Sequence, residues 1–412
     1  MRQFLLASTC FVALAAPAGA ETTISTTVTG PVRTSTVKTG GLPDDILINS
    51  SGVVNGNAGG AVIIDSNHRL NNQGTIQIGN VSNVAAVDVA AGVTSGITLS
   101  GKIIVDEPFT PTDADNDGDL DGPFATGTNR FGIRTNGAMT GDILITSSGT
   151  ITVEGNNSAG IYLGGPLTGS FRHDGSTSVL GNNTIGVRLS DVSGNTRVAG
   201  TITARGQGAI GFQSAGNIGG AMVLQGTITA TGYRLTTPPA DPSKLDADDL
   251  LQGGPAVSIE GNVAKGIILA VPPKDNSTTD NDEDDDGIED AKEGSAAIVS
   301  FGSAAALRIG SAGAITIGAT ENTGTGFGLI VDGGILGTGL YTGVDGNGLQ
   351  IGGLGGTVSI ANGIGVTGTI EAKSLDRNAT AVRLGAGATT PELRNAGKIL
   401  ASSGNNALAT AT

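Results

Sequence analysis

The stretch that decides the fold is a five-residue phrase that occurs four times, as GTITV at 149–153, GSTSV at 175–179, GTITA at 200–204 and GTITA at 226–230. The first residues of successive copies are 26, 25 and 26 positions apart. Within each phrase every second residue is suited to a buried position, which is the pattern of a β-strand with one buried face. A fixed period of this length indicates a repeat architecture.

Two further apolar runs complete each repeat. In the repeat that begins at Gly149 they are GIYL at 160–163 and the pair Leu167 and Phe171. The same order of segments begins again at Gly74 and Gly101, and near the end of the chain at Gly368 and Gly397. The repeat therefore covers most of the chain after residue 20, with three short strands per unit and glycine-rich turns between them.

Strands of three to five residues are too short to form stable isolated hairpins. Stacked as coils of an all-β, right-handed parallel β-helix, they would pair with equivalent strands of neighbouring coils. Ile151, Thr177, Ile202 and Ile228 would then form one inward ladder, with Thr, Arg and Glu outside and glycine at corners where φ is positive. We expect ~13 coils of ~25 residues, spaced ~4.8 Å apart.

Other repeat folds explain the pattern less well. An antiparallel barrel or sandwich needs hairpin turns and strands of ordinary length, and it leaves the fixed period unexplained. A propeller blade needs roughly 40 residues or more per repeat. The parallel β-helix is the fold that the sequence favours.

The composition suits this fold. Glycine accounts for 69 of 412 residues, aromatic residues for 3%, and tryptophan is absent, so the core must be built from small aliphatic side chains. The formal charge of -15 is local, because segments 113–121, 241–249 and 275–293 hold 5, 4 and 10 acidic residues, or 19 of the 37 in the chain. No basic patch with interleaved aromatics occurs, which disfavours a nucleic-acid partner.

Residues 1–20 have the pattern of a secretory signal peptide. Arg2 precedes an apolar run from Phe4 to Ala16, and Ala18-Gly19-Ala20 provides the small-residue cleavage site. A lipoprotein signal that uses Cys10 is the weaker alternative, because residues 7–9 are a poor lipobox. Cleavage after residue 20 would remove the one cysteine, so stability must come from the fold itself.

The repeat domain, residues 21–412, is interrupted by three acidic inserts at 106–128, 235–253 and 272–294. In the first insert, aspartates alternate along the chain and a glycine stands at the sixth position, which is the spacing by which one loop wraps a calcium ion. The predicted ligands are Asp113, Asp115, Asp117, Asp119 and Asp121. Phe124 stands where an EF-hand loop has its glutamate.

The third insert fits the calcium pattern more completely. Its predicted ligand positions, including the glutamate at position twelve, are Asp282, Asp284, Asp286, Ile288, Asp290 and Glu293. Asp-Gly-Ile followed by Asp resembles the calcium loops of thrombospondin type 3 repeats. The alternative is that these are solvated acidic loops that keep a glycine-rich rod soluble. The second insert shows no ligand spacing and is typical of a surface loop or short helix.

Motifs of catalysis are absent or uninformative. Matches to the dinucleotide-binding pattern at 206–211 and 363–368 lie in repeat turns and are expected by chance at this glycine content. His68 and His173 lie in different repeats, with no serine-elbow motif near either, and are interpreted as surface histidines. No CxxC, HExxH or P-loop motif occurs.

The signal peptide, the cysteine-free mature chain and the Gly-Thr-Ile-Thr repeats together resemble the passenger domains of Gram-negative autotransporters, especially the repetitive ones of alphaproteobacteria. The resemblance implies a β-helical passenger that is exported to the outer membrane, the cell surface or the medium through a C-terminal membrane β-barrel. No amphipathic barrel strands precede Thr412, so we expect the translocator barrel to lie outside this chain, which would be either the N-terminal part of a longer protein or a passenger separated from its barrel.

Two classes of function follow. The first is a non-catalytic structural or adhesive protein that presents loops to a surface partner or associates with itself into a homo-oligomer or filament. The alternative is a β-helical polysaccharide lyase or hydrolase, against which the scarcity of aromatic stacking platforms argues. Convergence of carboxylates and basic residues from three or more consecutive coils in one groove would favour the enzyme.

Overall fold

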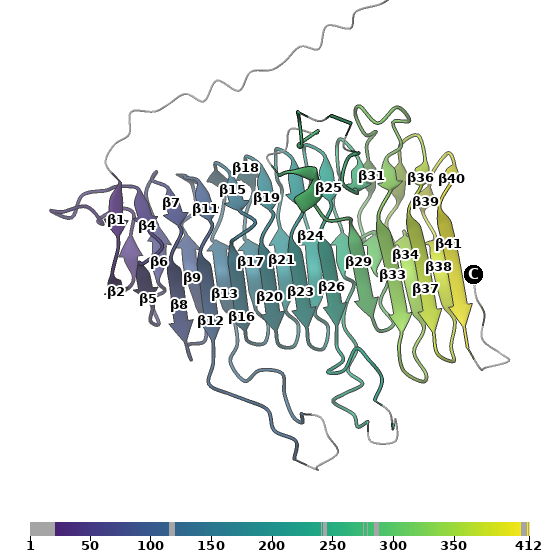
Figure 1. Ribbon diagram of the computed structural model, residues 1–412, viewed down its shortest axis with the longest axis horizontal. Helices are drawn as coiled ribbons and strands as arrows, with labels where there is room; N and C mark the ends of the chain where they lie inside the picture. The colour runs from purple at the N-terminus through teal and green to yellow at the C-terminus, as the bar shows by residue number, and fades with distance from the viewer. Residues whose placement is uncertain are drawn as a thin grey trace, which may run out of the picture.

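In the computed structural model the chain winds into a rod of stacked coils, drawn in Figure 1 from the first strand in purple to the last in yellow. The structure describes residues 21–114, 120–239, 241, 245–274, 276, 277, 279–283, 288–404, 410 and 412. Three long parallel sheets, named A, B and C here, run the length of the rod. The fold is a right-handed parallel β-helix, which confirms the prediction from the repeat. The predicted signal peptide lies outside the described residues.

Sheets A and B each have twelve strands, against the ~13 coils expected from the repeat length. Sheet A consists of β1 (Thr22–Ile24), β4 (Ile46–Ile48), β7 (Leu70–Asn72), β11 (Ile97–Leu99), β15 (Ile143–Ile145), β19 (Phe171–His173), β22 (Thr196–Val198), β25 (Met222–Leu224), β28 (Ile267–Leu269), β32 (Leu329–Val331), β36 (Ile364–Val366) and β40 (Leu393–Asn395).

Sheet B follows sheet A in each coil. It consists of β2 (Thr27–Thr29), β5 (Val53–Asn55), β8 (Thr75–Gly79), β12 (Lys102–Asp106), β16 (Thr150–Glu154), β20 (Ser176–Leu180), β23 (Thr201–Arg205), β26 (Thr227–Thr231), β29 (Ala297–Phe301), β33 (Gly334–Gly339), β37 (Thr369–Ser374) and β41 (Lys398–Ser403).

Sheet C closes each coil. It consists of β3 (Val32–Arg33), β6 (Val62–Ile64), β9 (Val84–Val89), β13 (Arg130–Thr135), β17 (Ala159–Leu163), β21 (Ile185–Leu189), β24 (Ile210–Ser214), β27 (Val257–Ile259), β30 (Leu307–Ile309), β34 (Gly346–Ile351) and β38 (Ala379–Leu384). Two three-stranded sheets lie between C and A, namely β10 (Val93–Thr94), β14 (Met139–Thr140) and β18 (Leu167–Thr168), and β31 (Ile315–Ile317), β35 (Val358–Ile360) and β39 (Ala388–Thr389).

The four copies of the repeat phrase form neighbouring strands of sheet B in the predicted register. Ile151 pairs with Thr177, which pairs with Ile202, which pairs with Ile228. All four side chains are at most 1% exposed. Because burying one such aliphatic side chain contributes about 1.5–3 kcal/mol, ladders of this kind in all three sheets supply most of the core, to which a few buried rings such as Phe171 and Phe212 are added.

The glycine that opens each phrase is required by coil stacking. A Cβ on Gly200 would overlap the carbonyl oxygen of Gly175, and a Cβ on Gly226 would overlap that of Gly200. These glycines do not have positive φ, so the expected reason for glycine is wrong in this column. Positive φ is found instead at the corner after sheet B, at Gly181 (142°) and Gly206 (139°).

The three inserts leave the rod at two different corners. The first lies between β12 and β13 and the second between β26 and β27, both at the corner from sheet B to sheet C, on the lower edge in Figure 1. The third lies between β28 and β29 at the corner from sheet A to sheet B, on the upper edge, and contains the 3-10 helix η2 (Asp290–Lys292). Within the described chain we find no helix with the length and hydrophobicity needed to span a membrane.

One histidine differs from the sequence interpretation. His173 in β19 is 0% exposed, so its interpretation as a surface residue is wrong. It points inward because it occupies the ladder position of Ile145 and Val198. Its Nε2 lies 2.7 Å from the Thr177 hydroxyl, and burial lowers its pKa to about 4. His68 is half-buried, with Nδ1 at 3.0 Å from the Ser66 hydroxyl.

Candidate functional site

The first and second inserts contact each other below the corner between sheets B and C. The Gly122 amide donates a hydrogen bond to Asp248 Oδ2 at 2.7 Å. Arg234 donates to the same oxygen from Nε at 3.2 Å and from Nη2 at 3.0 Å. The Arg234 guanidinium also lies over the ring of Phe124, 4.7 Å from its centroid. Phe124, which replaces the EF-hand glutamate, is therefore a packing residue that joins the two inserts.

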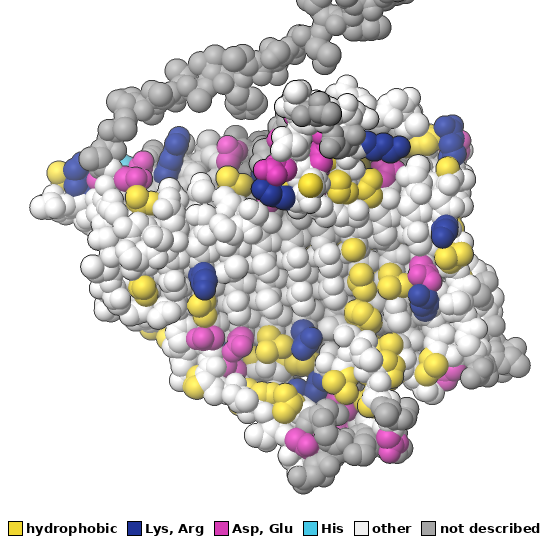
Figure 2. Space-filling view, in the orientation of Figure 1, with side chains coloured by type: hydrophobic (Ala, Val, Ile, Leu, Met, Phe, Trp, Pro, Cys, Tyr) yellow, Lys and Arg dark blue, Asp and Glu magenta, His cyan; other side chains and the backbone are white. Residues whose placement is uncertain are grey.

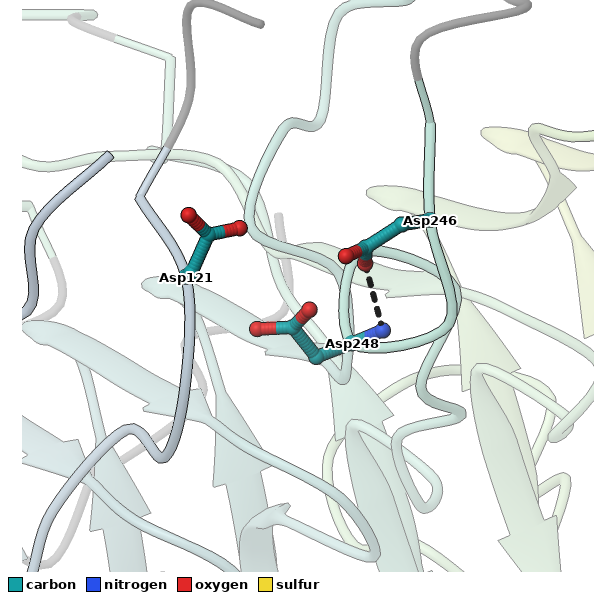
Figure 3. A group of neighbouring side chains, drawn as sticks. All are labelled: Asp121, Asp246 and Asp248. Atoms are coloured by element: carbon teal, nitrogen blue, oxygen red, sulfur yellow. Dashed lines mark hydrogen bonds between the residues drawn. The ribbon is translucent and has the colours of Figure 1, made fainter. Parts of the chain in front are cut away.

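This contact brings three aspartates together, one from the first insert and two from the second. Carboxylate oxygens of Asp121, Asp246 and Asp248 all lie within 4.8 Å of one another. Figure 3 shows the three side chains around one space, with the Asp248 amide bonded to Asp246 Oδ1 at 2.9 Å. It is the one group of three or more acidic, histidine or cysteine side chains this close in the part of the chain that the structure describes. Oxygen atoms in this arrangement suit a hard cation such as Ca²⁺.

The protonation equilibria of this group reflect its crowding. A hydrogen bond with the Asp248 carboxyl is the largest cause that raises the pKa of Asp246, and repulsion from the Asp248 charge adds to it. Burial alone would raise the pKa of Asp248, but hydrogen bonds from Asp246, Arg234 and the Gly122 amide outweigh burial and lower that pKa. Two close carboxylates of this kind favour a shared proton or a bound cation over two free charges.

The predicted ligands of the first insert are only partly described. Asp121 belongs to the aspartate group, and its Oδ2 also accepts a hydrogen bond from the Ala114 amide. Asp113 lies in the described part but is not a member of that group. Asp115, Asp117 and Asp119 lie outside the described residues.

In the third insert two of the predicted ligands, Asp290 and Glu293, are buried, whereas Glu289 remains exposed. Glu293, the predicted twelfth ligand, is 1% exposed and accepts a hydrogen bond from Arg197 of β22 at 2.9 Å. Asp290 Oδ1 accepts from the Glu283 amide at 3.2 Å. Asp282 and Ile288 are also described, whereas Asp284 and Asp286 lie outside the described residues. Among the described residues, the structure does not gather Asp282, Asp290 and Glu293 into one close group.

Asp290 Oδ2 and Glu283 Oε2, which are among the buried carboxylate oxygens of this insert, accept no hydrogen bond from a described residue. The whole Asp290 residue is 8% exposed. Burying an acceptor without a donor costs free energy, so these oxygens favour a cation beside them. The sequence pattern predicted Asp290 as a ligand but did not include Glu283, which lies between two predicted ligand positions.

A buried ion pair closes the base of the first insert. Arg130 donates to Glu107 at 2.9 Å, and the two side chains are 1% and 3% exposed. The guanidinium also donates to the carbonyls of Val81 at 2.7 Å and Glu154 at 2.8 Å. Burial would raise the pKa of Glu107, but hydrogen bonds from the backbone at Thr126 and Gly127 and the Arg130 charge outweigh it and lower the pKa.

A cleft of about 740 Å³ beside sheet A is the place where an enzyme site would be expected. It is lined by Glu21, Asp45, Arg69, Asn71 and Asp142, among others. Glu21, Asp45 and Arg69 directly precede β1, β4 and β7 and so come from three consecutive coils. Charged residues therefore do converge here, as the enzyme alternative requires.

The carboxylates of this cleft have a structural role that asparagine also fills. Asp45 Oδ1 accepts from the Arg69 amide at 2.9 Å, and Asp142 Oδ1 from the Ser170 amide at 2.7 Å. Asn195 holds the same place before β22 and accepts from the Ala221 amide at 3.0 Å. Each of these side chains fixes the start of the next coil, so their presence does not by itself require catalytic chemistry.

Comparison with known proteins gives no match: no family profile, curated protein or solved structure is significantly similar to this chain.

The aspartate group was missed by sequence reasoning because Asp121 and Asp248 are far apart in the chain and the second insert has no ligand spacing of its own. Its one sequence signal is that two acidic inserts begin after strands of the same sheet.

Proposed function

We propose that this chain is an exported, non-catalytic β-helical protein of the autotransporter-passenger type, whose rod displays calcium-binding inserts at the cell surface or in the medium. The observation that carries the proposal is the convergence of Asp121, Asp246 and Asp248 from two inserts on the edge of a long rod. The remainder of the chain is nearly neutral, so the acidic groups gather where the inserts gather.

Export is supported by the sequence and by the physics of the fold. The predicted signal peptide precedes a chain without cysteine, so no disulfide locks it before it crosses a membrane pore. In a solenoid each coil contacts mainly its neighbours, so folding can propagate coil by coil after export. The translocator β-barrel that this proposal requires would lie outside the chain.

A structural role is preferred to the polysaccharide-active alternative. The cleft beside sheet A has carboxylates, but Asp45 and Asp142 each accept a hydrogen bond from a backbone amide of the next coil, as the Asn195 side chain does. These two carboxylates lie three coils apart, or ~14 Å at the spacing of paired strands, and although Glu21 is one coil from Asp45, the Asp45 carboxylate already accepts from the Arg69 amide. Paired glycosidase carboxylates are only about 5–9.5 Å apart. We therefore propose a rod that binds a surface partner or a second copy of itself.

Calcium is expected to stabilise the full mature chain and a chelator to remove that stabilisation. A ligand present at 100 times its Kd stabilises the folded state by about 2.7 kcal/mol, because it binds the folded chain alone. Asp246→Asn is expected to remove much of the effect at the aspartate group, since it deletes one charged ligand from an exposed residue. Thermal unfolding with excess calcium or EGTA measures this.

Glu321→Gln is the matched control. It removes an exposed carboxylate that pairs with Lys265 at 3.1 Å and that belongs neither to an insert nor to the aspartate group. It should keep the full calcium response. An unfolding temperature that is the same in calcium and in EGTA would show that the inserts are merely solvated acidic loops.

A further inference from the structure

The outward face of sheet B carries a two-dimensional array of hydroxyl groups. Four neighbouring strands, β16, β20, β23 and β26, contribute two each, and all eight side chains are exposed or half-buried. The first row is Thr150, Ser176, Thr201 and Thr227, and the second row is Thr152, Ser178, Thr203 and Thr229. The register is unbroken, so each hydroxyl stands beside its equivalent in the next coil.

The geometry of paired strands fixes the two repeats of this array. Neighbours in one row are separated by the spacing between strands, ~4.8 Å. The two rows are separated by two residues of one strand, ~6.6 Å. The spacing between neighbours in a row is close to the shorter oxygen repeat on a prism face of hexagonal ice, and the spacing between the rows is about a tenth shorter than the longer repeat. The parallel β-helix thus holds the eight hydroxyls of sheet B in a rectangular array, and ordered water molecules can bind to it with a similar spacing.

The hydroxyls are available for an external ligand. In the described part of the chain, none of the eight makes a side-chain hydrogen bond to another protein group. Figure 2 shows this part of the face in white, without charged side chains, between the coloured residues of β12 and those of β29. The uncharged surface continues over β29 and β33 with Ala297, Val299, Gly334 and Leu336 at the equivalent positions.

Threonine suits such an array because its branched side chain has few χ1 rotamers. A hydroxyl that is already held in place loses little entropy when it joins an ordered water layer. The methyl group beside each threonine hydroxyl is apolar and favours ordered rather than bulk-like water at the face. Charged side chains, which hold strongly oriented hydration shells, stand only around the array, at Lys102, Glu154 and Arg205.

We infer that this face of sheet B binds ice. The eight hydroxyls would anchor a layer of water with the lattice spacing of a prism plane, and that layer would join the surface of a growing crystal. A polysaccharide is the less favoured occupant, because the array offers no aromatic ring, amide or charged group for stacking or bidentate bonding. The inference depends neither on calcium nor on the proposed export.

The test uses the full mature chain in two assays, partition into slowly growing polycrystalline ice and inhibition of ice recrystallisation. Thr203→Tyr places a bulky ring in the centre of the array, at an outward position of a β-strand, where aromatic residues are generally well tolerated, so the fold should be kept. We expect enrichment of the wild type in ice and a roughly tenfold loss of activity in this variant, because several hydroxyls lose contact together. Ser176→Thr with Ser178→Thr should increase activity.

Thr369→Tyr is the matched control, because Thr369 occupies the first row of the same sheet on β37, outside the array. It should retain wild-type activity. Circular dichroism checks that all variants are folded. Failure of the wild type to enter ice, equal activity of Thr203→Tyr and wild type, or binding to crystalline cellulose without ice activity would each overturn the inference.

Discussion

Replacement of Arg130 by methionine is expected to lower the free energy of unfolding by about 3–5 kcal/mol, because it leaves the Glu107 charge buried without its partner. Glu107 is 3% exposed and would keep its two backbone donors, the amides of Thr126 and Gly127 at 2.6 and 2.7 Å, and a side-chain hydrogen bond with Thr126, but no positive charge beside it. The carbonyls of Val81 and Glu154 would also lose a donor. Denaturant unfolding at neutral pH measures the change.

Two further variants separate the buried charge from simple loss of packing. Lys265→Met removes a surface ion pair whose partners are 47% and 63% exposed, and should change stability by at most about 1 kcal/mol. Combining Arg130→Met with Glu107→Gln should recover part of the loss, because no unpaired charge remains. If Arg130→Met were as mild as the surface control, the ion pair would not hold the base of the first insert.

Acidification from pH 6.5 to pH 4 is expected to remove up to about 3 kcal/mol of stability through His173 alone, at 1.36 kcal/mol per pH unit. Burial lowers the pKa of His173 from 6.5 to about 4, so the folded chain keeps it neutral while the unfolded chain binds a proton. This contribution is fully present above pH 6.5 and is lost as pH falls toward 4. Denaturant unfolding across this range measures the slope.

His173→Val is expected to flatten that slope. Valine is already present as Val198 at the next position of the same inward ladder, so the core should accept it. His68→Val retains His173 and should therefore retain the loss of stability on acidification. A slope that is unchanged by His173→Val would mean that other groups cause the acid sensitivity.

The fold could be predicted from the sequence because several patterns in it point to the same structure. In the repeats at 149–230, the alternation of residues indicates β-strands, the repeat length gives the size of a coil, and the aligned inward residues give the register that the strands adopt. Why glycine is needed at Gly175, Gly200 and Gly226 was harder to predict. At these equivalent positions the backbone of one coil lies so close to the next that a Cβ would overlap it, and this contact is evident only once the coils are stacked.

The candidate site was less accessible to sequence reasoning. Ligand spacing can predict a loop that wraps one ion by itself, and the prediction of Asp290 in the third insert was made in this way. It cannot reveal a group assembled from two loops, and Asp121, Asp246 and Asp248 come together only because β12 and β26 lie in one sheet and end at the same corner. His173 was misjudged for a similar reason, because its inward direction follows from register rather than from its own polarity.

Hydrogen exchange of the full mature chain with and without calcium tests most directly the claim that a preformed rod displays calcium-binding inserts. Calcium is expected to slow exchange in the inserts 106–128, 235–253 and 272–294 and to leave exchange in the strands of sheets A, B and C unchanged. No change in the inserts, or a change spread through the strands, would contradict this claim.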